Sequence, residues 1–180
     1  DAQTVLNSER HVPEEDVFQR AWHVSRYLFA GQHAVERRVL DAGSGEGYGA
    51  HLLSLVADHV TGLDYAQVAV DHARQRYATS NLEFHAADLG RLEGFDGPFD
   101  VITCFEVIEH LPDHDALLAS FRRRLAPGGV LLLSTPNLQW HGSDEDNPYH
   151  VSEVTPAELK REVSRHFDDV VVLGQIQESD

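Results

Sequence analysis

The chain has 180 residues, of which 42% are hydrophobic and 24% are charged, an ordinary balance for one globular domain with its own core. Lys and Arg total 14 against 30 Asp and Glu, and the formal net charge of -16 repels polyphosphates and disfavours nucleic acid as a partner. No apolar run approaches the roughly 20 residues of a membrane span. The single Cys104 cannot form an internal disulfide, which indicates a reducing, cytoplasmic location.

The predicted elements alternate between helices and strands. Helical spacing of apolar residues over Glu14–Gly31 indicates an N-terminal helical segment at residues 1–37, followed by the main domain at residues 38–180. The predicted strands are Arg38–Ala42, His59–Asp64, Leu82–Ala87, Phe99–Phe105, Val130–Ser134 and Val170–Leu173. The predicted helices between them are Tyr48–Ala57, Ala66–Tyr77, Asp113–Leu125 and Pro156–His166. This alternation predicts a doubly wound, mostly parallel sheet with helices on both faces, a three-layer α/β/α fold.

A glycine-rich loop follows the first predicted strand, with the sequence Asp41-Ala42-Gly43-Ser44-Gly45-Glu46-Gly47. Glycine loses more backbone entropy on folding than other residues, so this density indicates that something approaches the backbone closely. A Walker loop needs Gly-Lys-Ser/Thr, and no lysine follows Gly47. A dinucleotide fingerprint needs a small third residue, and Tyr48 occupies that place. The loop therefore favours a ligand other than a nucleoside triphosphate or a dinucleotide.

Acidic residues end the next two predicted strands. Asp64 lies about 20 residues after the glycines, where a carboxylate can accept from both hydroxyls of a ribose, and it could also cap the following helix. Asp88 ends the third strand, where the alternative is a turn residue before Gly90. Because parallel strands end at one edge of the sheet, we expect both carboxylates on the same side as the glycine loop.

Together these segments resemble the class I S-adenosylmethionine-dependent methyltransferases. The glycine loop is similar to their motif I, Phe99–Glu106 to their motif IV, and Leu125–Leu133 to their fifth strand and the loop before it. The matched segments occur in the family's order between Arg38 and Leu173. The resemblance implies a lid at residues 1–37 and a Rossmann-like domain over residues 38–180. It also implies S-adenosylmethionine as the cofactor, S-adenosylhomocysteine as its product, and methyl transfer as the reaction.

The resemblance also implies how the cofactor is held. It places Tyr65 against the adenine face, Asp88 at the adenine exocyclic amine with the backbone amide of Leu89 at a ring nitrogen, and Glu106 at the methionine end. The predicted cofactor-binding residues are Asp41, Gly43, Ser44, Gly45, Gly47, Asp64, Tyr65, Asp88, Leu89, Phe105 and Glu106.

The methyl acceptor is expected beside Phe105–Leu111. A sulfonium already activates its methyl carbon, so transfer needs mainly positioning, and a base only when the acceptor must lose a proton. Imidazole accepts a proton near pH 7, which makes His110 the candidate base, with Glu109 beside it in the predicted catalytic pair. The alternative is that His110 only hydrogen-bonds across a loop. The predicted acceptor is a hydroxyl of a small molecule, either sugar-linked or of a quinone or phenol type.

A divalent metal is the alternative for the same segment. Glu106, Glu109, His110 and the later His150 form an E-x-x-E-H…H pattern. It resembles that of small-RNA 2′-O-methyltransferases, where an ion holds the terminal ribose hydroxyls, and that of metal-using quinone O-methyltransferases. The oxygen-rich set favours Mg²⁺ or Mn²⁺. Methyltransferases without metal also carry E-x-x-E-H, so metal-assisted RNA methylation is kept as an alternative, beside a cofactor-binding module of a larger protein without activity of its own.

The carboxyl end departs from the family pattern. The family's sheet usually ends with an antiparallel seventh strand inserted between the fifth and the sixth. Here only Gln175–Asp180 follow the predicted sixth strand and its Gly174. We therefore expect the seventh strand to be absent or the chain to be truncated, with an exposed sheet edge that pairs with a second copy or with another domain.

Overall fold

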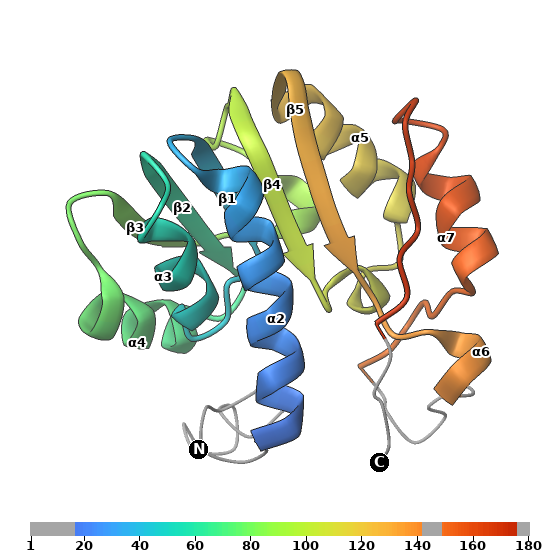
Figure 1. Cartoon of the computed structure of the whole chain (residues 1–180), viewed down its shortest axis with the longest axis horizontal. Coiled ribbons are helices and arrows are strands. Elements are labelled where there is room, and N and C mark those ends of the chain that lie inside the picture. Colours follow the sequence, from blue (N-terminus) through green and yellow to red (C-terminus); the bar gives the residue numbers. More distant parts are fainter. Residues whose placement is uncertain (1–16, 142–148, 176–180) are drawn as a thin grey trace.

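The computed structural model describes residues 17–141 and 149–175. Its strands are β1 (Arg38–Ala42), β2 (His59–Asp64), β3 (Leu82–Ala86), β4 (Phe99–Phe105) and β5 (Leu125–Ser134). They form one sheet in the order β3-β2-β1-β4-β5, and every neighbouring pair is parallel (Figure 1). The strand order reverses between β1 and β4, where ligands bind in open α/β sheets. The predicted doubly wound fold is confirmed.

Helices cover both faces of this sheet (Figure 1). They are α2 (Val17–Ala34), α3 (Tyr48–Ser54), α4 (Gln67–Tyr77), α5 (His114–Arg124), α6 (Leu138–His141) and α7 (Pro156–Val163). Successive strand side chains point to opposite faces, so Val39 packs in a cluster with α2, α3 and α4, whereas Leu40 packs in a second cluster with α5. Within the described residues, no helix has the length and apolar character needed to cross a bilayer.

Strand β5 begins earlier than predicted. The predicted strand was Val130–Ser134, but Leu125 already pairs with Phe99 on β4. The register shifts between Phe99 and Val101, and Gly128 adopts a φ of 77°. The strand therefore tolerates its glycines by carrying an irregularity of the bulge type near its start.

The predicted sixth strand at Val170–Leu173 is wrong, because these residues form no strand. Val171 is 81% exposed and Leu173 is 70% exposed. Apolar side chains favour a strand when a neighbouring layer buries them, and these side chains remain in solvent. Beyond β5, the chain up to Gln175 contains no further strand among its described residues. Pairing of the β5 edge with a second copy or another domain stays a prediction, and residues 1–16 of the predicted lid lie outside the described residues.

Packing between α2 and α3 predicts opposite effects for two glycine-to-alanine changes. A Cβ at Gly49 would overlap the ring of Tyr27, whereas a Cβ at Gly31 would meet nothing within 4 Å. We expect Gly49→Ala to lower the free energy of unfolding by about 1–3 kcal/mol. Gly31→Ala is the matched control and should raise it by about 0.5–1 kcal/mol, because alanine favours a helix interior. Urea denaturation measures both, and equal effects would contradict this packing.

Candidate functional site

The glycine loop at the end of β1 requires its glycines. Gly43, Gly45 and Gly47 adopt φ values of 90°, 52° and 90°, a region that side chains disfavour. A Cβ at Gly43 would overlap Val107, and one at Gly47 would overlap Phe84 on β3. The backbone amides of Gly43 and Ser44 both donate to the carbonyl of Leu63, each at 2.8 Å. The loop therefore turns tightly across the ends of β1 and β2.

Asp64 connects this loop to the next helix. Its Oδ2 accepts from the amide of Gly45 at 2.9 Å, and its Oδ1 accepts from the amide of Ala66 at 2.8 Å, just before α4. The carboxylate is thus fixed at the carboxyl end of β2, where the sequence predicted it. Tyr65 beside it is 81% exposed, so its ring is accessible to a ligand.

Asp88 and Leu89 lie at the end of β3. The Oδ1 of Asp88 accepts from the amide of Gly90 at 2.9 Å, which caps a short 3₁₀ helix over Leu89–Arg91. The turn role considered for Asp88 is therefore present. The Leu89 side chain is buried in the core, so only its backbone is suited to a ligand. Their contacts with adenine stay predictions.

Asp41 lies beneath the glycine loop and is completely buried. Thr103 on β4 donates to it at 2.7 Å, and the Tyr27 hydroxyl on α2 lies 3.2 Å from both of its oxygens. Burial raises the pKa of Asp41 to about 7, although the hydrogen bonds from Thr103 and Tyr27 oppose this rise. The residue was predicted to bind the cofactor, but this position suits support of the loop from below. Nothing in the sequence singled out Tyr27 beyond its place in an aromatic helix.

Glu106 follows β4 in a strained conformation, with a φ of 55°. Its Oε1 accepts from Ser134 at 2.7 Å and lies 3.0 Å from Nη1 of Arg26 on α2. This contact with Arg26 is an ion pair without hydrogen-bond geometry, and within the described residues the buried Nη1 has no hydrogen-bond acceptor. The side chain before Glu106, Phe105, is 8% exposed and packs edge-on against Tyr27. Sequence spacing gave no signal for Arg26.

Glu109 connects the segment after β4 to the later loop at Val151 and Ser152. Its side chain is buried, and its carboxylate accepts from Thr135 at 2.9 Å. Its backbone carbonyl accepts from the amides of Val151 and Ser152, which holds the later loop in place. Burial, followed by repulsion from Glu106, raises the pKa of Glu109 to about 7.

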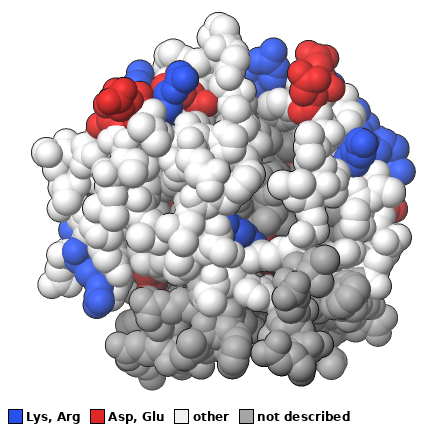
Figure 2. All heavy atoms as spheres, viewed as in Figure 1, with Lys and Arg blue, Asp and Glu red and all other residues white. Residues whose placement is uncertain are grey.

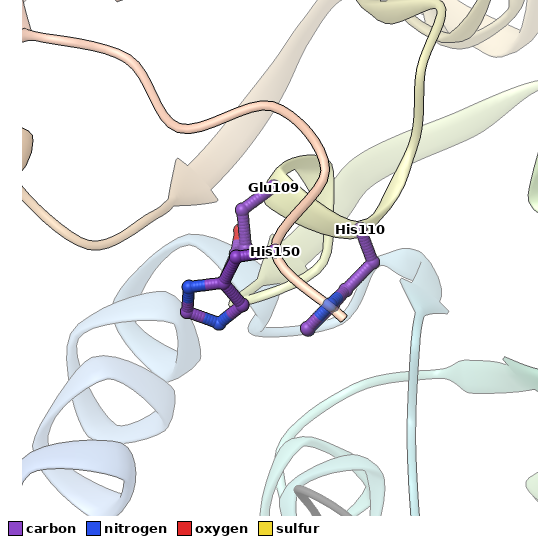
Figure 3. Close-up of side chains that lie close together, drawn as sticks. All are labelled: Glu109, His110 and His150. Carbon is purple, nitrogen blue, oxygen red and sulfur yellow. The ribbon is translucent and has the colours of Figure 1, made fainter. Parts of the chain in front are cut away.

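Two histidines approach each other beside Glu109 (Figure 3). Nδ1 of His110 lies 3.0 Å from the Tyr149 carbonyl, so this nitrogen donates, and Nδ1 of His150 lies 2.7 Å from the Glu153 carboxylate. The centroids of the two imidazole rings are 5.1 Å apart. Glu109, His110 and His150 each offer one atom that could bind a metal ion, and these three atoms lie within 4.8 Å of one another.

Of the four predicted metal ligands, three therefore converge. The fourth, Glu106, belongs to no such group among the described residues, because its carboxylate faces Arg26 and Ser134. Glu106 also has a positive φ, directly after the end of β4.

Comparison with known proteins connects this geometry to a family. A profile described as a methyltransferase domain matches residues 14–167. A probable S-adenosylmethionine-dependent methyltransferase of Mycolicibacterium smegmatis is 40% identical over 160 residues, covering 86% of this chain and 61% of that protein. The chain belongs to the class I S-adenosylmethionine-dependent methyltransferase family. It spans 61–63% of the length of such mycobacterial relatives.

More distant proteins agree with the fold. The YcgJ protein of Bacillus subtilis superposes with a TM-score of 0.69 at 23% identity, over 81% of this chain and 68% of that one. The N-methyltransferase NodS of Bradyrhizobium japonicum, in complex with S-adenosylhomocysteine, superposes with a TM-score of 0.63 at 22% identity. The match covers 73% of this chain and 69% of that one. A ubiquinone biosynthesis O-methyltransferase of Aromatoleum aromaticum is 34% identical over 104 residues, covering 56% of this chain and 44% of that protein.

The buried carboxyl of Asp41 predicts a pH-dependent stability difference. Its pKa is raised from 3.8 to about 7, so it stabilises the fold below its unfolded pKa, and this contribution is lost as the pH rises toward 7. Asp41→Asn cannot ionise and keeps a similar shape. We expect the stability of the variant relative to the native protein to rise between pH 5 and pH 8 in urea denaturation. A difference that stays constant over this range would contradict the assigned pKa.

Proposed function

We propose that the protein binds S-adenosylmethionine across the glycine loop and transfers its methyl group to a hydroxyl of a small molecule. The observation that carries this proposal is the convergence of Glu109, His110 and His150 above the end of β4. That strand end adjoins the glycine loop, since Gly43 touches Val107. A proton acceptor therefore lies next to the proposed cofactor site.

The chemistry of the site suits each part of the cofactor. In this proposal the Asp64 carboxylate accepts from the ribose hydroxyls, while Tyr65 and the turn at Asp88 contact adenine. The methionine end is a zwitterion, and the ion pair between Arg26 and Glu106 offers one charge of each sign. We assign the ligand α-carboxylate to Arg26 and its α-ammonium group to Glu106, because opposite charges at hydrogen-bond distance make the stronger hydrogen bonds.

His110 supplies the base for a hydroxyl acceptor. Its Nδ1 donates to the Tyr149 carbonyl, so in the neutral ring the basic nitrogen is Nε2. During transfer, the acceptor oxygen forms a bond to the methyl carbon as the carbon–sulfur bond breaks. The hydroxyl proton passes to Nε2, and neutral S-adenosylhomocysteine leaves. The ubiquinone biosynthesis O-methyltransferase supports an acceptor of the phenol or quinone type, and a sugar-linked hydroxyl is the other class we propose.

A divalent metal is the second candidate, favoured by the three converging ligand atoms. Both imidazoles are oriented through Nδ1, by the Tyr149 carbonyl and the Glu153 carboxylate, as ligating histidines commonly are. With one carboxylate and two imidazoles, the set favours Mn²⁺ over Mg²⁺. Such an ion would polarise the acceptor hydroxyl. RNA is disfavoured as its substrate, because the net charge is -16 and basic side chains on the face of Figure 2 form small separate groups.

Replacement of Asp64 tests the cofactor assignment. We expect Asp64→Ala to weaken S-adenosylhomocysteine binding at least about 100-fold, because it removes the proposed ribose acceptor together with the anchor of the Gly45 amide. Asp71→Ala is the matched control, since among the described residues this exposed carboxylate on α4 bonds only to neighbouring side chains of its own helix. Isothermal titration calorimetry measures both variants, and undiminished affinity of Asp64→Ala would refute the assignment.

Replacement of His110 tests the base. We expect His110→Ala to bind S-adenosylhomocysteine like the native protein and to slow turnover of a hydroxyl acceptor about 10²–10⁴-fold. The release of S-adenosylhomocysteine measures the rate. Unchanged turnover would remove His110 as the base.

Chelation separates the base from the metal. If His110 acts as the base without a metal ion, EDTA should leave the rate of methyl transfer unchanged. Loss of activity in EDTA, with recovery on adding Mn²⁺ or Mg²⁺, would establish the metal instead.

A further inference from the structure

A side chain from the far end of the described chain bonds to helix α2. Oε1 of Gln175 accepts from Nε of Arg26 at 2.8 Å. Nε2 of Gln175 donates to the Ser25 hydroxyl at 2.8 Å and to the Trp22 carbonyl at 3.3 Å. The Gln175 carboxamide thus bonds to α2 both as an acceptor and as a donor.

These contacts determine how the Arg26 guanidinium lies. The group is planar, so the bond at Nε fixes the plane in which Nη1 and Nη2 lie. Nη1 then reaches 3.0 Å from Glu106, at the strand end assigned to the methionine of the cofactor. The Arg26 side chain is only 19% exposed, and the described residues supply Nη1 with no hydrogen-bond acceptor. The anchored guanidinium therefore keeps donor capacity on its buried side.

We propose that Gln175 is a positioning residue for cofactor binding, acting through Arg26 on the ligand α-carboxylate. The inference rests on the proposed function, because it requires the methionine end of the cofactor to lie at Glu106. Gln175 itself is exposed and bonds to Nε of Arg26, whereas Glu106 lies near Nη1.

The advantage of such an anchor is entropic. A long arginine side chain loses rotamer freedom when it is fixed, and an anchor that forms on folding removes that cost from the binding step. Loss of the anchor should therefore weaken only those ligands that use Arg26.

Two ligands that differ at the methionine end provide the test. S-adenosylhomocysteine carries the α-carboxylate and the α-ammonium group, whereas 5′-methylthioadenosine has the same adenosine and thioether without them. We expect Gln175→Ala to weaken S-adenosylhomocysteine about 3–10-fold and to leave 5′-methylthioadenosine unchanged in calorimetry. Arg26→Ala should show the same selectivity with a larger loss. The double variant should bind no more weakly than Arg26→Ala, because Gln175 acts through Arg26.

Gln67→Ala is the matched control, since this exposed glutamine on α4 bonds to Asp71 of its own helix. It should change neither affinity. The proposal is overturned if Gln175→Ala weakens both ligands equally, which would indicate a structural role, or if it changes neither. Failure of the native protein to bind S-adenosylhomocysteine would instead overturn the proposed function, and an unaffected Arg26→Ala would overturn the methionine assignment.

Discussion

The buried carboxyl of Asp41 joins the parts of the molecule that build the site. It lies near the end of β1, accepts from Thr103 on β4, and accepts from Tyr27 on α2. Burying a carboxyl is costly unless donors satisfy it, so these three elements must pack together for the group to be accommodated. The glycine loop begins directly above this contact, and its path across the sheet therefore depends on how α2 and β4 meet β1.

Parallel strand ends then bring distant residues together. Asp64 ends β2 and holds the loop from one side through Gly45, while Glu106 directly follows β4 on the other side. His110 and His150 are far apart in sequence, yet the carbonyl of Glu109 binds the later loop at two amides and brings them together. The fold thus places the proposed cofactor-binding groups on strand ends and the proposed acceptor-side groups on a loop fixed to β4.

Sequence spacing predicted what is local. The glycines, the acidic residue at the end of β2 and the alternation of strands and helices follow from turn geometry and periodicity. Contacts of α2 could not be predicted, because helical spacing does not say which neighbour Tyr27 or Arg26 meets. The strand predicted at Val170–Leu173 failed for a related reason. Its apolar side chains favour a strand only where a neighbouring layer buries them, and Val171 and Leu173 are exposed. Glu106 was grouped with Glu109 by spacing and by resemblance to metal-using methyltransferases, but its carboxylate contacts Arg26 and Ser134.

The central claim is that a hydroxyl of a small molecule receives the methyl group. The most direct measurement incubates the protein with methyl-labelled S-adenosylmethionine and a panel of sugars, quinols, amines and RNA, and locates the label in each product by mass spectrometry and NMR. We expect acceptor-dependent release of S-adenosylhomocysteine with the label on oxygen of a sugar or quinol. Label on an amine nitrogen or on RNA, or no acceptor-dependent release, would contradict it.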